Sequence, residues 1–184
     1  MKTLPDLLAP GLDIVSIGIN PSVYSVERGF NFARPGNRFW PALNASGLVP
    51  ERLEPSAAAV RRLFRVHGIG FTDLVKRATD RADQLTSADY VRGARLLERK
   101  LRRYRPAIAW FQGTSAYRIF LEHLRTPRAK ISPGLQPERF GATRVYVTPN
   151  PSGANPAANL DKLVPLYRKL ARLRAKLATR PPAR

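Results

Sequence analysis

Two short motifs with the same three residues, Asn-Pro-Ser, provide the side chains best suited to binding a ligand. The first is Gly-Ile-Asn-Pro-Ser at residues 18–22, and the second is Asn-Pro-Ser-Gly at residues 150–153. The amides of Asn20 and Asn150 each donate and accept hydrogen bonds, and the proline that follows restricts the turn. Asn-Pro is also common in ordinary turns, so either motif alone is weak evidence for a binding site. The presence of both motifs, each after a predicted strand, is stronger evidence for such a site.

Each motif directly follows an apolar run that is typical of a buried strand. The runs are residues 12–19 and residues 143–147. The carboxyl ends of parallel strands meet at one edge of a sheet, and open α/β sheets bind their ligands at that edge. We therefore expect the two motifs to face one ligand together.

A segment rich in aromatic residues, glycine and arginine, residues 29–40, lies between the motifs in the sequence. An aromatic ring on a loop can stack on a nucleic acid base, which contributes about 1–3 kcal/mol per base. Phe39 and Trp40 are better explained as core residues at the start of a helix. Phe30 and Phe32 are harder to bury, and stacking is an open alternative for them.

The apolar periodicity predicts strands that alternate with helices. Alternation of this kind indicates parallel βαβ crossovers and helices on both faces of the sheet. We expect a three-layer α/β/α sandwich with a central, mostly parallel four-stranded sheet. A single domain covers residues 1–178, and residues 179–184 form a basic C-terminal tail. The predicted strands are residues 12–19, 69–74, 107–111 and 143–147, the predicted helices are residues 55–66, 86–104, 114–124 and 159–178, and residues 25–37 are a predicted loop.

Charge and composition limit the class of partner. The 184 residues include 32 Lys and Arg against 13 Asp and Glu, a net charge of +19, which attracts polyanions. Nucleic acid is the favoured partner and a membrane surface comes second, although an arginine-rich genome would produce the same bias. The absence of cysteine excludes disulfides and thiolate zinc sites, so we expect no metal and no cofactor. The sequence predicts neither a signal peptide nor a membrane span, and therefore a cytoplasmic protein.

The motifs, in this order and spacing, resemble the mismatch-specific uracil/thymine DNA glycosylases. Similarity extends through residues 70–75, 93–97 and 104–109, and covers the chain from about residue 12 to residue 170. The resemblance implies a monofunctional repair enzyme that flips uracil, thymine or a damaged pyrimidine out of G·U and G·T mispairs. It would hydrolyse the N-glycosidic bond and leave an abasic site. The implied partner is double-stranded DNA with a mispaired uracil, bound by a monomer at the bacterial nucleoid.

The resemblance also assigns roles by position. Asn20 matches the catalytic asparagine that holds a water molecule, and Phe32 matches the ring that stacks on the flipped base. Ser22 replaces a glycine common in the family, and Ala154 replaces a larger side chain that fills the gap in the duplex. Strict dependence on a mispaired guanine is therefore open. The implied substrate-binding residues are Ile19, Ser22, Phe32 and Asn150, and the implied DNA-binding residues are Pro151, Ser152, Gly153, Ala154 and Asn155.

An amide cannot take a proton from water, so a carboxylate is a candidate second catalytic group. The segment after the second predicted strand contains Asp73, Asp80 and Asp83, and Asp83 is our candidate. The alternative is that Asp83 is a solvated acid close to Arg77 and Arg81. The alternative function for the whole chain is a nonenzymatic nucleic-acid-binding module on the same fold. A phosphate-binding nucleotide enzyme is disfavoured because the chain has no P-loop motif.

Overall fold

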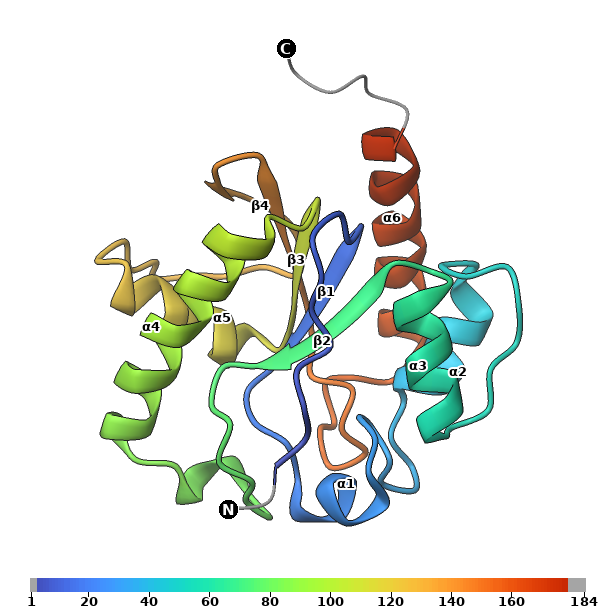
Figure 1. The fold of residues 1–184 in the computed structure, drawn as a ribbon, viewed down its shortest axis with the longest axis horizontal. Coiled ribbons are helices and arrows are strands. Elements are labelled where there is room, and N and C mark those ends of the chain that lie inside the picture. The colour runs from blue at the N-terminus through green and yellow to red at the C-terminus, as the bar shows by residue number, and fades with distance from the viewer. Residues whose placement is uncertain (1–2, 179–184) are drawn as a thin grey trace.

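The computed structural model describes residues 3–178, and the predicted tail at residues 179–184 lies outside the described residues. Within that range one sheet is formed, with the strand order β2-β1-β3-β5-β4 (Figure 1). The pairs β1–β2, β1–β3 and β3–β5 are parallel, and β4 runs antiparallel to β5. The strands are β1 (Ile14–Gly18), β2 (Ile69–Asp73), β3 (Ile108–Gln112), β4 (Gly134–Phe140) and β5 (Thr143–Thr148).

Helices cover both faces of the sheet, so the parallel strands are buried on both sides and are apolar almost throughout. One face packs against α2 (Phe39–Ser46), α3 (Ala57–Arg65) and α6 (Leu160–Ala178). The other face packs against α4 (Ser87–Tyr104) and α5 (Thr114–His123). The predicted α/β class, three-layer arrangement and mostly parallel sheet are confirmed. The helices predicted at residues 55–66, 86–104, 114–124 and 159–178 are present with similar bounds.

The sheet has five strands, so the predicted number of four is wrong. The missing strand, β4, contains Pro137, Glu138 and Arg139 and lacks the apolar pattern of the others. Within the described residues it lies at the edge of the sheet and pairs with β5 alone. An edge strand tolerates proline and charged residues because one side of its backbone makes no ladder hydrogen bonds.

The segment at residues 25–37, predicted as a loop, begins within a short helix, α1 (Val23–Arg28). Ser22 caps this helix, since its Oγ accepts a hydrogen bond from the backbone N–H of Ser25 at 3.1 Å. Gly29 ends it with a left-handed backbone conformation, φ 76°. Six residues are too few to show the 3.6-residue periodicity on which the prediction depended.

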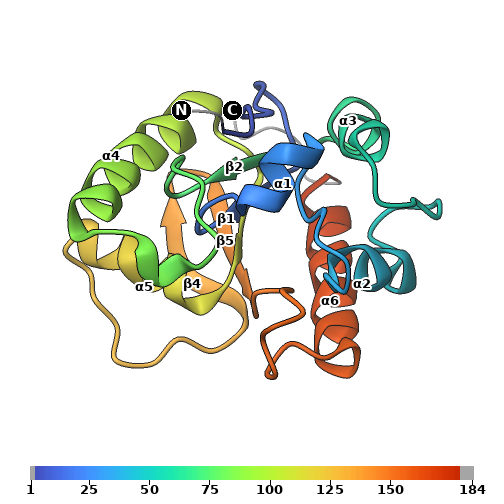
Figure 2. The same ribbon diagram turned by 90° about the horizontal axis from the view of Figure 1, so that it is seen from below.

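The carboxyl ends of the parallel strands and the segments that follow them gather at one end of the molecule, with α1 (Figure 2). No helix within residues 3–178 is both long enough and apolar enough to cross a membrane.

Candidate functional site

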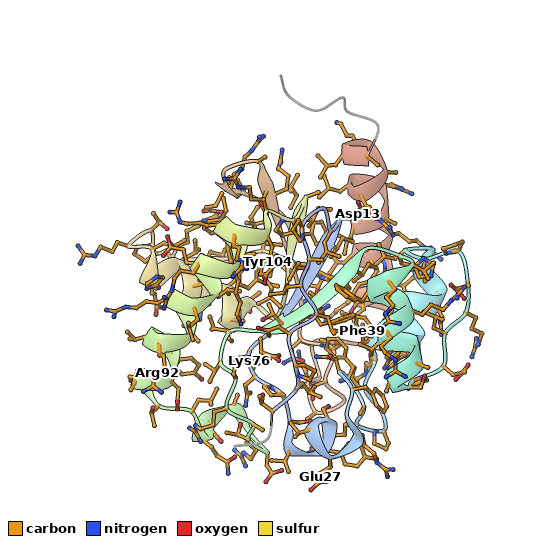
Figure 3. The ribbon with its side chains drawn as sticks, in the orientation of Figure 1. Asp13, Glu27, Phe39, Lys76, Arg92 and Tyr104 are labelled. Atoms are coloured by element: carbon orange, nitrogen blue, oxygen red, sulfur yellow. The ribbon has the colours of Figure 1, made fainter. Side chains whose placement is uncertain are left out.

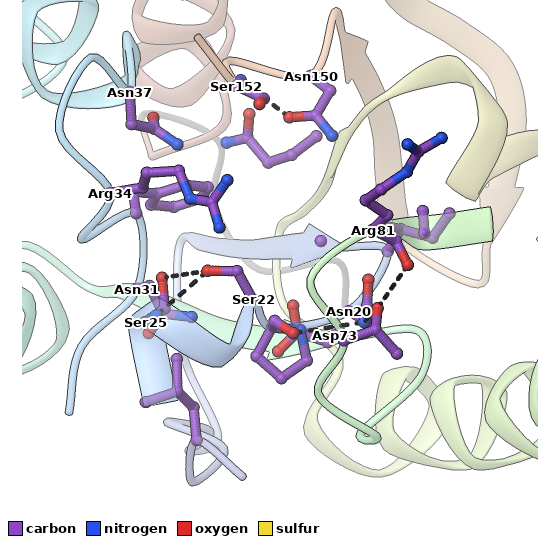
Figure 4. Close-up of a pocket in the computed structure, with 18 of the residues that line it drawn as sticks. Asn20, Ser22, Ser25, Asn31, Arg34, Asn37, Asp73, Arg81, Asn150 and Ser152 are labelled. Atoms are coloured by element: carbon purple, nitrogen blue, oxygen red, sulfur yellow. Dashed lines mark hydrogen bonds between the residues drawn. The ribbon is translucent and has the colours of Figure 1, made fainter. Parts of the chain in front are cut away.

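A cavity of about 420 Å³ opens at the carboxyl edge of the sheet. Most of its lining comes from four stretches, residues 16–25, 31–37, 71–83 and 150–154 (Figure 4), and Leu4 and Gln112 complete it. The two Asn-Pro-Ser motifs therefore lie at one site, as their position after parallel strands predicts. Of the sequence-derived candidates, the cavity lining includes Ile19, Asn20, Ser22, Phe32, Asp83, Asn150, Ser152 and Ala154.

Asn20 is held by the segment that follows β2. Its Nδ2 donates hydrogen bonds to Thr79 Oγ1 at 2.7 Å, the Arg77 carbonyl at 3.0 Å and the Pro21 carbonyl at 3.3 Å. Carbonyl oxygens only accept hydrogen bonds, so these contacts fix which end of the amide is nitrogen. The Asn20 Oδ1 receives no hydrogen bond from any residue in the described range, and it is the part of the amide left for a ligand.

The segment around Thr79 is tied back to the first motif. The Thr79 N–H donates to the Pro21 carbonyl at 3.2 Å, and its hydroxyl donates to the Arg81 carbonyl at 2.8 Å. Arg77 anchors the same segment to the start of α4 through Asp89, with an N–O distance of 2.7 Å. The orientation of Asn20 thus depends on residues 57 to 61 positions further along the chain.

Phe32 lies in the lining with its ring supported from behind. The ring stacks on Phe39, with centroids 4.1 Å apart and planes 14° apart, and meets the edge of Phe71 at 6.4 Å. The Phe32 backbone has a positive φ of 58°, and its carbonyl accepts a hydrogen bond from Trp40 Nε1 at 3.2 Å. Because Phe39 covers one face of the ring, a base could stack only on the opposite face. Phe39 and Trp40 are fully buried, as expected.

Hydrogen bonds of Ser22 and Ile19 hold the first motif in place. The Ser22 hydroxyl is occupied as the cap of α1 and also donates to Ser25 Oγ at 3.0 Å. The Ile19 carbonyl accepts a hydrogen bond from the Val75 N–H at 2.8 Å, which joins β1 to the segment after β2. Both residues line the cavity.

The second motif forms hydrogen bonds within its own turn. Asn150 Oδ1 accepts a hydrogen bond from the Ser152 N–H at 3.0 Å, and the Asn150 carbonyl accepts one from Asn155 Nδ2 at 2.9 Å. The side-chain oxygen of Asn150 is therefore used inside its own turn. Pro151 is buried, whereas Gly153 and Ala154 are exposed.

Arg38 fastens this second loop to the segment that carries Phe32. Its backbone N–H donates to the Pro151 carbonyl at 2.8 Å, and its guanidinium donates to the carbonyls of Ser152 and Asn155, both at 3.0 Å. The backbones also approach closely, since a Cβ on Gly153 would lie 2.8 Å from the carbonyl oxygen of residue 36. The exposed tip of the loop is therefore presented on a fixed base.

Asp83 lies at the rim of the cavity, where 59% of its side chain is exposed and Arg81 forms an ion pair with it at 2.5 Å. This exposed environment agrees with the alternative given above, in which Asp83 is a solvated acid next to an arginine. Its catalytic role stays a prediction.

Asp73 is a cavity residue whose importance the sequence reasoning missed. It is the last residue of β2 and is 5% exposed. Burial raises the pKa of its carboxyl to about 6, against the attraction of Lys76, whose Nζ is 3.9 Å from Oδ2. The available signal was its position at the end of an apolar strand, paired with Gly18 in β1.

Buried polar side chains form the floor of the cavity. Gln112, the last residue of β3, donates from Nε2 to Ser16 Oγ at 3.2 Å, and its Oε1 accepts from Thr148 Oγ1 at 3.3 Å. Gln112 and Ser16 both line the cavity. The site therefore combines aromatic rings, amide side chains and carboxyl groups in a space large enough for one base. No cluster of three or more possible metal ligands occurs within residues 3–178.

Comparison with known protein families identifies the family of this chain. The model of the uracil DNA glycosylase superfamily matches residues 5–171. The chain belongs to this superfamily. Membership implies a DNA glycosylase that acts on uracil, and therefore a hydrolase of base excision repair that binds DNA.

A solved structure supports the same fold. The chain is similar to a protein of Methanosarcina acetivorans, described as a candidate uracil DNA glycosylase and solved by solution NMR. The two share 18% sequence identity with a TM-score of 0.57, over 92% of this chain and 97% of the other. At this identity the likeness extends to the fold alone.

Proposed function

We propose that the protein is a monofunctional glycosylase of the mismatch-specific type, which removes uracil or thymine from G·U and G·T mispairs in double-stranded DNA. It would act as a monomer. The unoccupied oxygen of Asn20, held in a base-sized cavity beside the Phe32 ring, is the observation that carries the proposal. A base must leave the duplex to enter such a cavity, and a mispaired base leaves most easily.

Asn20 would act by holding the attacking water. Its Oδ1 accepts one hydrogen bond from the water and orients an oxygen lone pair toward the sugar carbon. Positioning of this kind lowers the barrier without removing a proton, which suits a reaction whose sugar becomes positively charged before attack. Backbone N–H groups of Ile19 and Ser22 are the proposed donors to the base. Phe32 would stack on it, and Asn150 would shape the wall beside it.

Residues 151–155 would enter the duplex next to the extruded nucleotide. The exposed tip, Gly153 and Ala154, offers little side-chain volume to fill the gap. We therefore expect a weaker preference for mispairs than a bulky residue would give. Exposed arginines would add salt-dependent affinity for phosphates. Arg92, for example, lies on the outer side of α4 (Figure 3).

The test is a substrate panel with G·U, A·U and G·T duplexes and single-stranded uracil DNA, followed by alkali to break abasic sites. We expect cleavage at uracil, with the largest kcat/KM for G·U. Salt-sensitive DNA binding without release of any base would instead support the nonenzymatic module.

Asp83 is tested in the same panel with Asp83→Asn. A loss of more than about 100-fold in kcat would support a catalytic role. An unchanged rate would identify Asp83 as a solvated acid.

A further inference from the structure

The carboxyl group of Asp73 has an unusual position, because it is nearly enclosed and yet has no hydrogen bond. Its Oδ2 is buried without a hydrogen-bond partner, and no residue in the described range donates a hydrogen bond to either oxygen. Its Oδ1 lies against Gly18, where a Cβ would approach to 2.5 Å. A side chain at residue 18 would force the carboxyl group, which lines the cavity, to shift (Figure 4).

The neighbouring lysines do not neutralise Asp73, because another carboxylate already binds them. Lys76 Nζ is 2.9 Å from Asp6 Oδ1, and Lys100 Nζ is 2.7 Å from Asp6 Oδ2. Burial opposes ionisation of Asp6, but its hydrogen bonds to Lys100 and Lys76 outweigh burial and lower its pKa. Both lysines therefore form their ion pairs with Asp6. The negative charge of Asp6 also raises the pKa of Asp73.

The proton on neutral Asp73 has a favoured position. Lys76 Nζ lies 3.9 Å from Oδ2 and disfavours a proton there, so Oδ1, next to Gly18, is the favoured oxygen for the proton. The other ionisable side chains of the cavity lining lie on its exposed rim, where water screens them. They are Arg34, Asp80, Arg81 and Asp83.

The Asp73 side chain lies on the same face of the sheet as the ring on which a base would stack. Asp73 and Phe71 are two residues apart on β2 and share a face of the sheet, and the Phe32 ring packs against Phe71 on that face. A base stacked on Phe32 would therefore lie on the side of the sheet to which Asp73 Oδ1 belongs.

We propose that Asp73, in its neutral form, contacts the base and donates a hydrogen bond from Oδ1 to the C4 carbonyl oxygen of the pyrimidine. This inference rests on the proposed function. A donor at that oxygen stabilises the negative charge that the departing base acquires when the glycosidic bond breaks. It also disfavours cytosine, whose amino group would set one donor against another. Asp73 would thus select bases that carry a carbonyl group at this position.

The first test is the pH dependence of kcat/KM on single-stranded uracil DNA for the wild-type protein and Asp73→Asn. The pKa of Asp73 is about 6, so wild-type kcat/KM should fall about tenfold per pH unit above pH 6. The amide of the variant donates at every pH, so its profile should be flat and its kcat/KM at pH 8 higher than that of the wild type. A folded but inactive Asp73→Asn protein at pH 6, or a flat wild-type profile, would overturn the proposal.

Asp80→Asn is the matched control. It removes an exposed acid from the same rim and should leave the slope of the wild-type profile unchanged. A slope that disappears in this variant would assign the titration to the rim and contradict the proposal.

A readout without activity separates failure of this inference from failure of the proposed function. We expect the Asp73 carboxyl carbon to titrate near pH 6 in an NMR experiment on the full chain. Free uracil should bind about tenfold more weakly per pH unit above that value. Absence of base release with both effects present would refute only the proposed function. Titration below pH 4 would refute the role of Asp73.

Discussion

The two walls of the cavity carry the same Asn-Pro-Ser motif but use it in different ways. In the first wall, residues 18–22 with residues 72–83, the Asn20 nitrogen is bound by the protein and its oxygen remains available. In the second wall, residues 150–155 with residues 31–38, the Asn150 oxygen is bound within its own turn. Both asparagines follow a parallel strand at the same edge. One is arranged to act on a ligand and the other to shape a loop.

The difference comes from what packs behind each motif. Thr79 and the Arg77 carbonyl bind the Asn20 nitrogen, which leaves the Asn20 oxygen without a hydrogen bond from the described residues. Arg38 instead occupies the carbonyls of the second loop and leaves Asn150 to make a local turn. A motif in a sequence therefore indicates where a polar group lies, and its neighbours decide which atom faces a ligand.

Asn20→Ala should have the largest effect and would separate the walls most clearly. Loss of the water-positioning oxygen should lower single-turnover kcat on G·U DNA by about 100- to 10,000-fold, with DNA affinity nearly unchanged. Asn150→Ala, the matched change in the other wall, should lower kcat by no more than about tenfold. Equal losses in the two variants would contradict the division of roles.

Asp73→Asn should remove a pH dependence of the free energy of unfolding that originates in the first wall. The folded-state pKa of Asp73, about 6, is above the ordinary 3.8, so the neutral acid stabilises the fold fully below pH 4. That advantage is lost as pH rises through 6, and Asn never acquires the charge. In urea unfolding, the variant should gain about 3 kcal/mol over the wild type between pH 4 and pH 7. A difference that does not change with pH would show that Asp73 is ionised throughout.

Arg38→Ala should act on the second wall alone. It leaves the carbonyls of Ser152 and Asn155 without their charged donor, which costs about 1–3 kcal/mol of folding free energy. The loop that would enter DNA should loosen, and duplex affinity measured by fluorescence anisotropy should fall about tenfold. The rate on single-stranded uracil DNA should change much less. Arg34→Ala, a change to a neighbouring exposed arginine, is the control for loss of charge.

Thr79→Val is the mildest change and tests the support of Asn20. Valine keeps the shape of threonine but removes the acceptor of the 2.7 Å hydrogen bond from Asn20 Nδ2. A neutral hydrogen bond contributes about 1 kcal/mol, so kcat should fall about fivefold with unchanged KM. An unaltered kcat would show that the two backbone carbonyls alone fix the amide.

The sequence predicted the parallel strands, both motifs at one edge and the helices that cover the sheet. These features follow from local patterns, because buried strands need continuous apolar runs and long helices need a repeating apolar face. The edge strand β4 and the six-residue α1 were missed since neither carries such a pattern. Asp73 was noticed with Asp80 and Asp83, but its position at the end of an apolar strand, which separates it from the two exposed acids, was not used.

The sequence by itself determined which polar residues stand at the carboxyl edge of the sheet, because their order after the strands is covalent. Only the tertiary structure decided which atoms those residues present. The Asn20 nitrogen is bound by a threonine 59 positions away, and burial raises the pKa of Asp73, to which the negative charge of Asp6, 67 positions earlier, adds. Hydrogen bonds and charges act over a few ångströms in space, and the distances between these groups are set by the fold.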